Sequence, residues 1–176
     1  MTPVSQQKNH ILPDLLAPGL NVVFVGTAAG IRSAQQKAYY ASSGNRFWRT
    51  LFDVGITPRL FRPEEYRELL SLGIGATDLC KTQAGADHAI DDFDVSGFER
   101  KIWNYRPRAI AFTSKKGGSI WLNCSTGAIR CGLQSSARES GMAVFVLPSP
   151  SGRATSHWDI TPWQQLACWL RESAPV

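Results

Sequence analysis

Cysteine is scarce in this chain of 176 residues, and its four copies lie far apart. None of them belongs to a Cys-x-x-Cys pair, which argues against a zinc site. The scattered spacing also argues against a four-cysteine iron–sulfur cluster. We therefore predict no metal and no cofactor. Reduced thiols in or near the core are expected at Cys80, Cys124, Cys131 and Cys168.

Long apolar runs are also absent. No stretch approaches the roughly 20 apolar residues of a transmembrane helix, and residues 1–10 are too polar for a signal peptide. These absences predict a cytoplasmic protein. Residues 1–14 are expected to form a mobile tail, followed by a turn at Pro18 and Gly19. The length favours a single domain over residues 1–176.

Acidic residues are the minority among the charged side chains. There are 14 Asp and Glu against 19 Lys and Arg, so the net charge is +5 and the isoelectric point is about 9.2. Hydrophobic residues make up 43% of the chain, which is typical of a globular protein. The positive balance favours a polyanionic partner such as nucleic acid, although many basic proteins bind none.

Apolar runs of strand length alternate with helical patterns along the chain. This alternation predicts a three-layer αβα sandwich around a mainly parallel sheet. Ser96-x-x-Glu99 is a capping-box pattern, and Thr161 precedes a proline as a helix cap would. The predicted strands cover residues 21–25, 109–112 and 143–147, with a strand or connector at 73–79, and the predicted helices cover residues 45–54, 63–72, 96–105, 120–124 and 161 onward.

Three predicted strands end in loops of small or polar residues, at 26–30, 113–116 and 148–153. The carboxyl ends of parallel strands meet at one edge, where an open α/β sheet binds its ligand. The first loop has the form Gly-x-x-x-Gly, which is neither the dinucleotide fingerprint nor a phosphate-binding loop with its lysine. An enzyme that acts on nucleotide phosphates is therefore disfavoured.

Two further patterns accompany the first loop. Residues 26–30 read Gly-Thr-Ala-Ala-Gly, residues 45–48 read Asn-Arg-Phe-Trp, and residues 149–152 read Ser-Pro-Ser-Gly. The combination resembles the uracil-DNA glycosylase superfamily, in particular its mismatch-specific uracil/thymine branch. The motifs of that branch read Gly-Ile-Asn-Pro-Gly, Asn-Arg-Phe-Trp and Asn-Pro-Ser-Gly. The resemblance extends over residues 15–170 and implies the same α/β fold.

The resemblance implies that a flipped-out base is held at the first loop. Tyr40 matches the aromatic residue that stacks on the base, and Ser33 matches a serine near it. Without the resemblance, Tyr40 reads as a packed surface tyrosine and Ser33 as a loop serine. The implied base-binding positions are Gly26, Thr27, Ala28, Gly30, Ser33 and Tyr40.

In the family, the second-motif loop enters the minor groove and fills the gap left by the flipped base. Arg153 falls where relatives often insert an apolar side chain, so it could fill the gap or bind a phosphate. The ordinary alternative is a solvated arginine. Together with two lysines on the predicted rim, the DNA-binding positions are Lys115, Lys116, Ser151, Gly152 and Arg153.

Two positions depart from the family pattern. Ala28 replaces the asparagine that positions the attacking water, and Ser149 replaces an asparagine or histidine. Asp78, Asn45 and Ser149 are the polar residues expected near that water. Each also has a structural interpretation, because Asp78 could cap a turn, Asn45 could cap its helix and Ser149 could order its loop.

The leading hypothesis is a monofunctional DNA glycosylase that hydrolyses the N-glycosidic bond of uracil, and by extension of other deaminated bases, as a monomer on DNA. A DNA-binding protein of the same fold with little or no cleavage is the alternative, favoured by the missing asparagine. A hydrolase of free nucleosides ranks third, because the positive charge and the Arg153 loop weigh against it.

Overall fold

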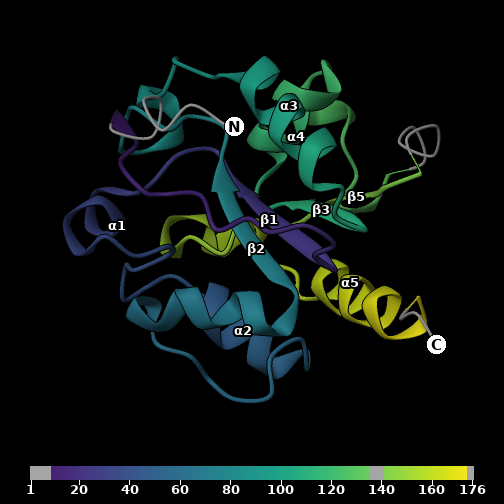
Figure 1. The fold of residues 1–176 in the computed structure, drawn as a ribbon. Helices are drawn as coiled ribbons and strands as arrows, with labels where there is room; N and C mark the ends of the chain where they lie inside the picture. The colour runs from purple at the N-terminus through teal and green to yellow at the C-terminus, as the bar shows by residue number, and fades with distance from the viewer. Residues whose placement is uncertain (1–8, 135–140, 174–176) are drawn as a thin grey trace.

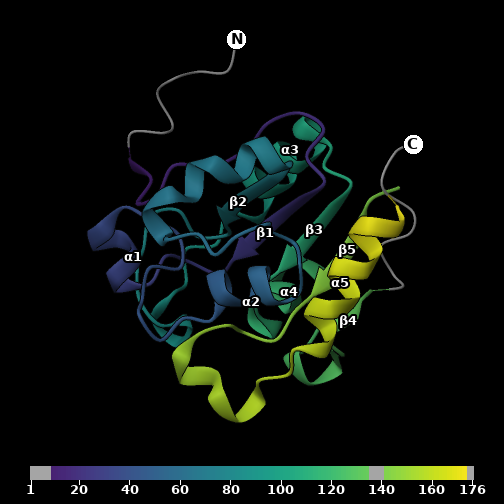
Figure 2. The same ribbon diagram turned by 90° about the horizontal axis from the view of Figure 1, so that it is seen from below.

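The computed structural model describes residues 9–134 and 141–173. Its strands are β1 (Val22–Gly26), β2 (Ile74–Asp78), β3 (Ala109–Phe112), β4 (Gly132–Leu133) and β5 (Ala143–Val146). They form one sheet in the order β2-β1-β3-β5-β4 (Figures 1 and 2). All pairs are parallel except β4 with β5, which is antiparallel. The four parallel strands confirm the sequence prediction, whereas β4 was not predicted.

The helices are α1 (Ile31–Gln36), α2 (Phe47–Asp53), α3 (Val95–Tyr105), α4 (Lys115–Leu122) and α5 (Thr161–Glu172), with the 3-10 helices η2 (Pro63–Leu72), η3 (Asp87–Ala89), η4 (Thr126–Ala128) and η6 (Gly152–His157). Side chains from α2, η2 and α5 form one core with the sheet. Those from α3 and α4 form a second core with the other side of the strands. Helices therefore cover both faces (Figures 1 and 2), and the predicted αβα sandwich is confirmed.

Aromatic rings join α2 and α5 to β1. The Phe24 ring meets the Phe47 ring edge-on at 5.2 Å between centroids and stacks with the Trp163 ring at 6.0 Å. All three side chains are fully buried. Burying a side chain of this kind contributes about 1.5–3 kcal/mol. This packing holds Phe47, the first residue of α2, against the central strand β1. Asn45, one of the predicted site residues, lies two positions before it.

The strand register brings the functional loops together. Gly26 at the end of β1 pairs with Asp78 at the end of β2, and Val25 pairs with Phe112 at the end of β3. Phe112 pairs in turn with Val146 at the end of β5. The four parallel strands thus end at one level, so that the loops after them form a common rim, as the sequence predicts.

Two predicted helix caps are wrong. Asp94, not Ser96, caps α3, because its side chain accepts a hydrogen bond from the Gly97 N–H at 2.8 Å. At α5, Asp159 accepts from the Thr161 N–H at 2.9 Å, while Thr161 already lies inside the helix. In both cases an aspartate slightly earlier in the chain takes the role, because the direction in which the chain enters the helix decides which side chain reaches the free N–H groups.

Two helices also differ from their predicted form. α4 begins at Lys115, five residues before the predicted start at residue 120, because Ser114 accepts from the Gly117 N–H at 3.0 Å and caps it. Residues 63–72 form a 3-10 helix with the predicted bounds, ended by Gly73 in the left-handed region at φ 73°.

The predicted tail is wrong where the structure describes it near residue 14. Leu12 is only 1% exposed, and the Ile11 N–H donates to the Lys81 carbonyl at 2.8 Å. The buried Asp14 carboxylate pairs with the Lys81 ammonium at 2.9 Å. The segment is therefore part of the core. Residues 1–8 lie outside the described residues.

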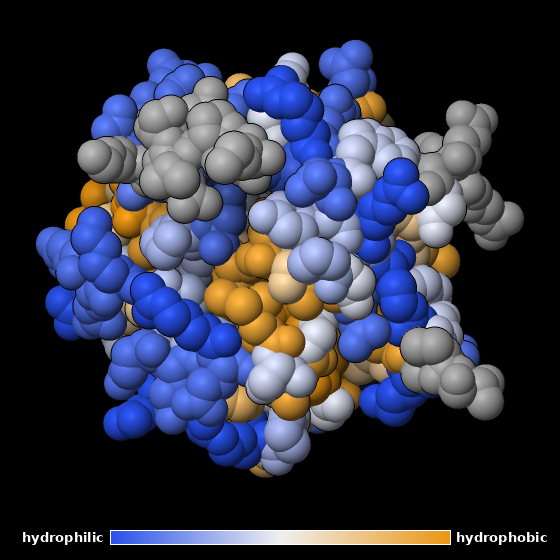
Figure 3. Space-filling model, viewed as in Figure 1, coloured by the Kyte–Doolittle hydropathy of each residue, from blue (hydrophilic) through white to orange (hydrophobic). Residues whose placement is uncertain are grey.

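The surface is polar over most of the face in Figure 3, around a central apolar area. No helix of the described ranges is both long and apolar enough to cross a membrane. Of the cysteines, Cys80 is buried, but Cys124 and Cys168 are exposed, contrary to expectation.

Candidate functional site

The centre of the rim is a close contact between the first loop and the end of β2. A Cβ added at Gly26 would lie 2.3 Å from an Asp78 carboxylate oxygen and 3.6 Å from the Tyr40 hydroxyl oxygen. A side chain at position 26 would displace the Asp78 carboxyl group. Glycine here therefore allows backbone, carboxyl and phenol groups to converge.

Tyr40 is held firmly in this cluster. Its ring stacks on the Phe47 ring with 3.8 Å between centroids and 18° between planes. Its hydroxyl lies 3.1 Å from Thr113 Oγ1, and because Thr113 donates to the Val25 carbonyl, the Tyr40 hydroxyl is the donor. The Tyr40 backbone has φ 52°, which is rare for a residue with a bulky side chain. Such outliers cluster at functional sites.

Asp78 is a buried carboxyl group, with 4% of the residue exposed. None of the described residues hydrogen-bonds its side chain. Burial raises its pKa to about 6, against the opposing effect of the Lys81 ammonium. Burial, and then the nearby Asp78, also raises the pKa of Tyr40. The site thus contains an acid that changes charge near neutral pH.

A chain of hydroxyl groups links the first loop to α4. Thr27 Oγ1 lies 3.1 Å from Ser114 Oγ, and Ser114 Oγ accepts from the Gly117 N–H. The Thr27 side chain also hydrogen-bonds the Asp87 carboxylate. Partial desolvation of its carboxyl group raises the pKa of Asp87, whereas Lys116, Thr27 and His88 lower it. The sequence analysis did not single out Asp87, because this residue belongs to no motif. The only sequence feature that points to it is its place in the polar loop after β2.

The second-motif loop packs directly on the loop before α2. The Arg46 N–H donates to the Pro150 carbonyl at 2.8 Å, and the Arg46 guanidinium lies over the Trp158 ring at 5.3 Å. A Cβ at Gly152 would lie 2.9 Å from the Gly44 carbonyl oxygen. The two motifs that are distant in sequence therefore form one surface.

Three predicted site residues use their side-chain oxygen for local structure. Asn45 Oδ1 accepts from the Phe47 N–H at 2.9 Å, Ser149 Oγ from the Ser151 N–H at 3.3 Å, and Ser33 Oγ from the Ala41 N–H at 3.0 Å. The structural interpretations of Asn45 and Ser149 are thus present in the fold, and Asp78 lies at the rim. Catalytic roles for Asn45, Asp78 and Ser149 remain predictions.

The predicted cations are available to a ligand. Lys115 and Lys116 occupy the first turn of α4, and Arg153 lies in η6; all three are exposed. A helix N-terminus carries a partial positive charge, which the two lysines reinforce. Ser151 holds the second-motif loop by accepting from the Arg153 N–H at 3.3 Å.

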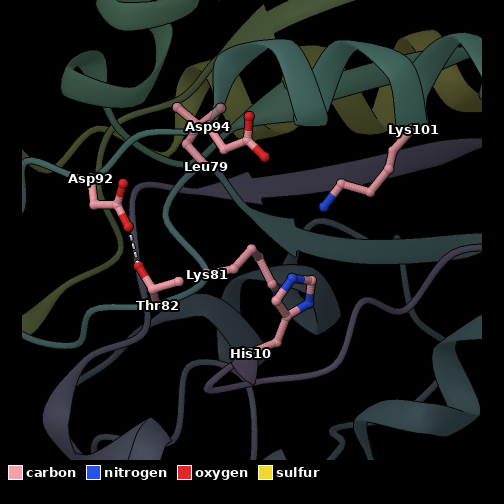
Figure 4. Close-up of a pocket in the computed structure, with 7 residues that line it drawn as sticks. All are labelled: His10, Leu79, Lys81, Thr82, Asp92, Asp94 and Lys101. Atoms are coloured by element: carbon pink, nitrogen blue, oxygen red, sulfur yellow. Dashed lines mark hydrogen bonds between the residues drawn. The ribbon is translucent and has the colours of Figure 1, made fainter. Parts of the chain in front are cut away.

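A buried ion cluster supports the rim from behind. Asp14 binds Lys81 at 2.9 Å and Lys101 at 2.8 Å, and the Lys81 ammonium donates to the Tyr39 hydroxyl at 3.2 Å. Burial raises the pKa of Asp14, but the two lysines outweigh it and bring the pKa to about 2. His10, Lys81 and Lys101 line a cavity of about 80 Å³ beside the cluster (Figure 4). The cluster ties the N-terminal segment to the residue next to Tyr40.

The profile of the Uracil DNA glycosylase superfamily matches residues 13–171. This chain belongs to that superfamily. A solution NMR structure of a protein from Methanosarcina acetivorans, provisionally described as a uracil DNA glycosylase, is similar in fold. The TM-score is 0.61 at 22% identity, over 92% of this chain and 95% of the other. Membership of this superfamily implies DNA as the class of substrate.

Proposed function

We propose that this superfamily member is a monofunctional uracil-DNA glycosylase of the mismatch-specific uracil/thymine branch, which acts as a monomer on DNA. The observation that carries the proposal is the fixed Tyr40 ring beside Gly26 and the buried Asp78 carboxyl group. An aromatic face, exposed loop backbone and a buried polar group are what an extruded base requires. Excision of other deaminated bases would depend on the same cluster.

DNA binding would use the three exposed cations around this cluster. Lys115 and Lys116 lie next to the hydroxyl chain from Thr27, and Arg153 lies in the loop that packs on residues 44–46. Phosphate contacts position the duplex, and the second-motif loop, including Ser151 and Gly152, would enter the gap left by the base.

Cleavage needs no covalent nucleophile. As the base departs, the sugar becomes cationic and the base anionic, so aimed N–H groups of the loop from Gly26 to Gly30 would stabilise the leaving group. Water then adds to the sugar carbon. Ala28 offers no polar side chain for that water, which is the observation favouring the second candidate, a protein that recognises a damaged base with little or no cleavage.

The test uses labelled duplexes with uracil, thymine or hypoxanthine opposite guanine, and single-stranded DNA with uracil. Alkali converts abasic sites to strand breaks. The proposal predicts breaks at the uracil position with the wild-type chain. Tight binding of the uracil duplex without breaks would support the binding protein instead, and neither binding nor breaks would exclude both.

A further inference from the structure

The reaction needs a group that holds water beside the sugar and removes its proton, and the first loop lacks one at Ala28. Asn45 and Ser149 each use the side-chain oxygen on a neighbouring N–H. Asp78 is buried, with 4% of the residue exposed. A water-activating group has to meet both solvent and the first loop.

Asp87 meets both. The chain after β2 runs alongside the first loop: the Cys80 N–H donates to the Thr27 carbonyl at 2.9 Å, and the Gly85 N–H donates to the Ala29 carbonyl at 2.9 Å. Ala29 and Ala84 also form a parallel bridge. η3 begins two residues later at Asp87, which is exposed to solvent. The main chain therefore brings the exposed Asp87 residue alongside the first loop.

A series of hydroxyl groups leads from α4 toward the Asp87 carboxylate. An ionised carboxylate only accepts hydrogen bonds, so Thr27 donates to Asp87. The Thr27 oxygen then accepts from the Ser114 hydroxyl, whose own oxygen accepts from the Gly117 N–H. Every donor points toward the carboxylate. A hydrogen bond to the ionised form favours that form, and the exposed carboxylate can also accept from a water molecule.

We propose that Asp87 is the catalytic residue that holds and deprotonates the attacking water, in place of the side chain missing at Ala28. The inference rests on the proposed function. The water oxygen forms a bond to the cationic C1′ that remains after cleavage of the C1′–N bond. The electron pair of that bond leaves with the base, whose anion is protonated by solvent. One water proton passes to Asp87 and then to solvent, so the products are the free base and an abasic site.

The rate should depend on pH through this carboxylate. The charged groups facing Asp87 are Lys116 from α4 and His88 from its own turn. Partial desolvation of the carboxyl group raises the Asp87 pKa above its usual value, and both neighbours oppose this change. A base acts only when deprotonated, so single-turnover excision should rise with pH through an acid limb and then level off.

The experiment compares wild type with Asp87→Asn on the guanine–uracil duplex, with enzyme in excess. Asp91→Asn is the matched control, because Asp91 is an exposed carboxylate of the same loop bonded to Gln83. Asp87→Asn should lower the rate constant by about 10²–10⁴-fold and abolish the acid limb. It should leave binding to an abasic duplex unchanged. Asp91→Asn should match wild type, and Asp87→Glu, which keeps a carboxylate, should retain the limb.

The outcomes separate this inference from the proposed function. Excision by Asp87→Asn within threefold of wild type would overturn the role of Asp87 and leave the glycosylase intact. Asp87 would be a structural residue if the Asp87→Asn variant were slow but retained the wild-type acid limb. The same conclusion would follow if its binding to the abasic duplex fell as much as its excision rate. A wild-type chain that releases no base from any of the four substrates would overturn the proposed function, and this role with it.

Discussion

The ring of Tyr40 lies on the ring of Phe47, with 3.8 Å between their centroids and 18° between their planes. Phe47 is fully buried at the start of α2, so one face of Tyr40 rests on the core. If Tyr40 stacks on a base as proposed, a flat ring fixed in this way would do so at little entropic cost.

Tyr40→Ala should therefore weaken binding of a uracil-containing duplex by about 1–3 kcal/mol, the usual contribution of base stacking. Tyr40→Phe keeps the ring and loses only the hydrogen bond to Thr113, so it should bind nearly as wild type does. The measurement is the Kd for the uracil duplex and for an undamaged duplex. An equal loss on both would show that Tyr40 is structural.

Lys115→Ala, Lys116→Ala and Arg153→Ala should each reduce the salt dependence of DNA binding. Each phosphate contact releases about one counterion, so the slope of log Kd against log salt concentration should change by about one unit per variant. Arg59→Ala is the control, because Arg59 already pairs with Glu65 and Glu68. Unchanged slopes in all three variants would remove these cations from the DNA footprint.

Asp14→Asn should destabilise the fold by about 3–5 kcal/mol, because it leaves the Lys81 ammonium buried without its carboxylate. Asp53→Asn, which breaks an exposed pair with Arg49, should change stability by less than about 0.5 kcal/mol. The measurement is urea unfolding at pH 7. Similar losses for the two variants would contradict the role of the buried pair.

The Asp14 pair also predicts a pH dependence. The folded pKa of about 2 lies below the ordinary value of 3.8, so its stabilisation is complete above about pH 5. It should disappear as the pH falls toward 2, a loss of about 2 kcal/mol. Asp14→Asn should lack this part of the acid sensitivity.

The effect of Asp78 on the pH dependence of stability should have the opposite sign. Its folded pKa of about 6 lies above 3.8, so the fold favours the uncharged acid. Stability should fall between about pH 4 and pH 6, by about 3 kcal/mol, as the buried group ionises. Asp78→Asn should remove this decline and be the more stable protein at pH 8, whereas Asp91→Asn should keep it. Equal pH dependence of wild type and Asp78→Asn would show that Asp78 does not ionise in that range.

The sequence predicts the sheet well because buried parallel strands are continuous apolar runs, as at Val22–Gly26 and Ala109–Phe112. It predicts caps poorly, since Asp94 and Ser96 are both competent and only the path of the chain chooses between them. The sequence predicts that the loops after the strands meet at one edge, but not which side chains of distant loops contact one another. Asp87 meets Thr27 sixty residues away, a pairing that only the folded path of the chain creates.

The most direct measurement of the central claim is the amount of free base released from DNA. Wild-type protein in excess is incubated with a guanine–uracil duplex, and free uracil is quantified by mass spectrometry alongside alkali-revealed breaks. The glycosylase account predicts free uracil in equal amount to abasic sites, with the backbone intact before alkali. A duplex that is bound but retains all its uracil would contradict it.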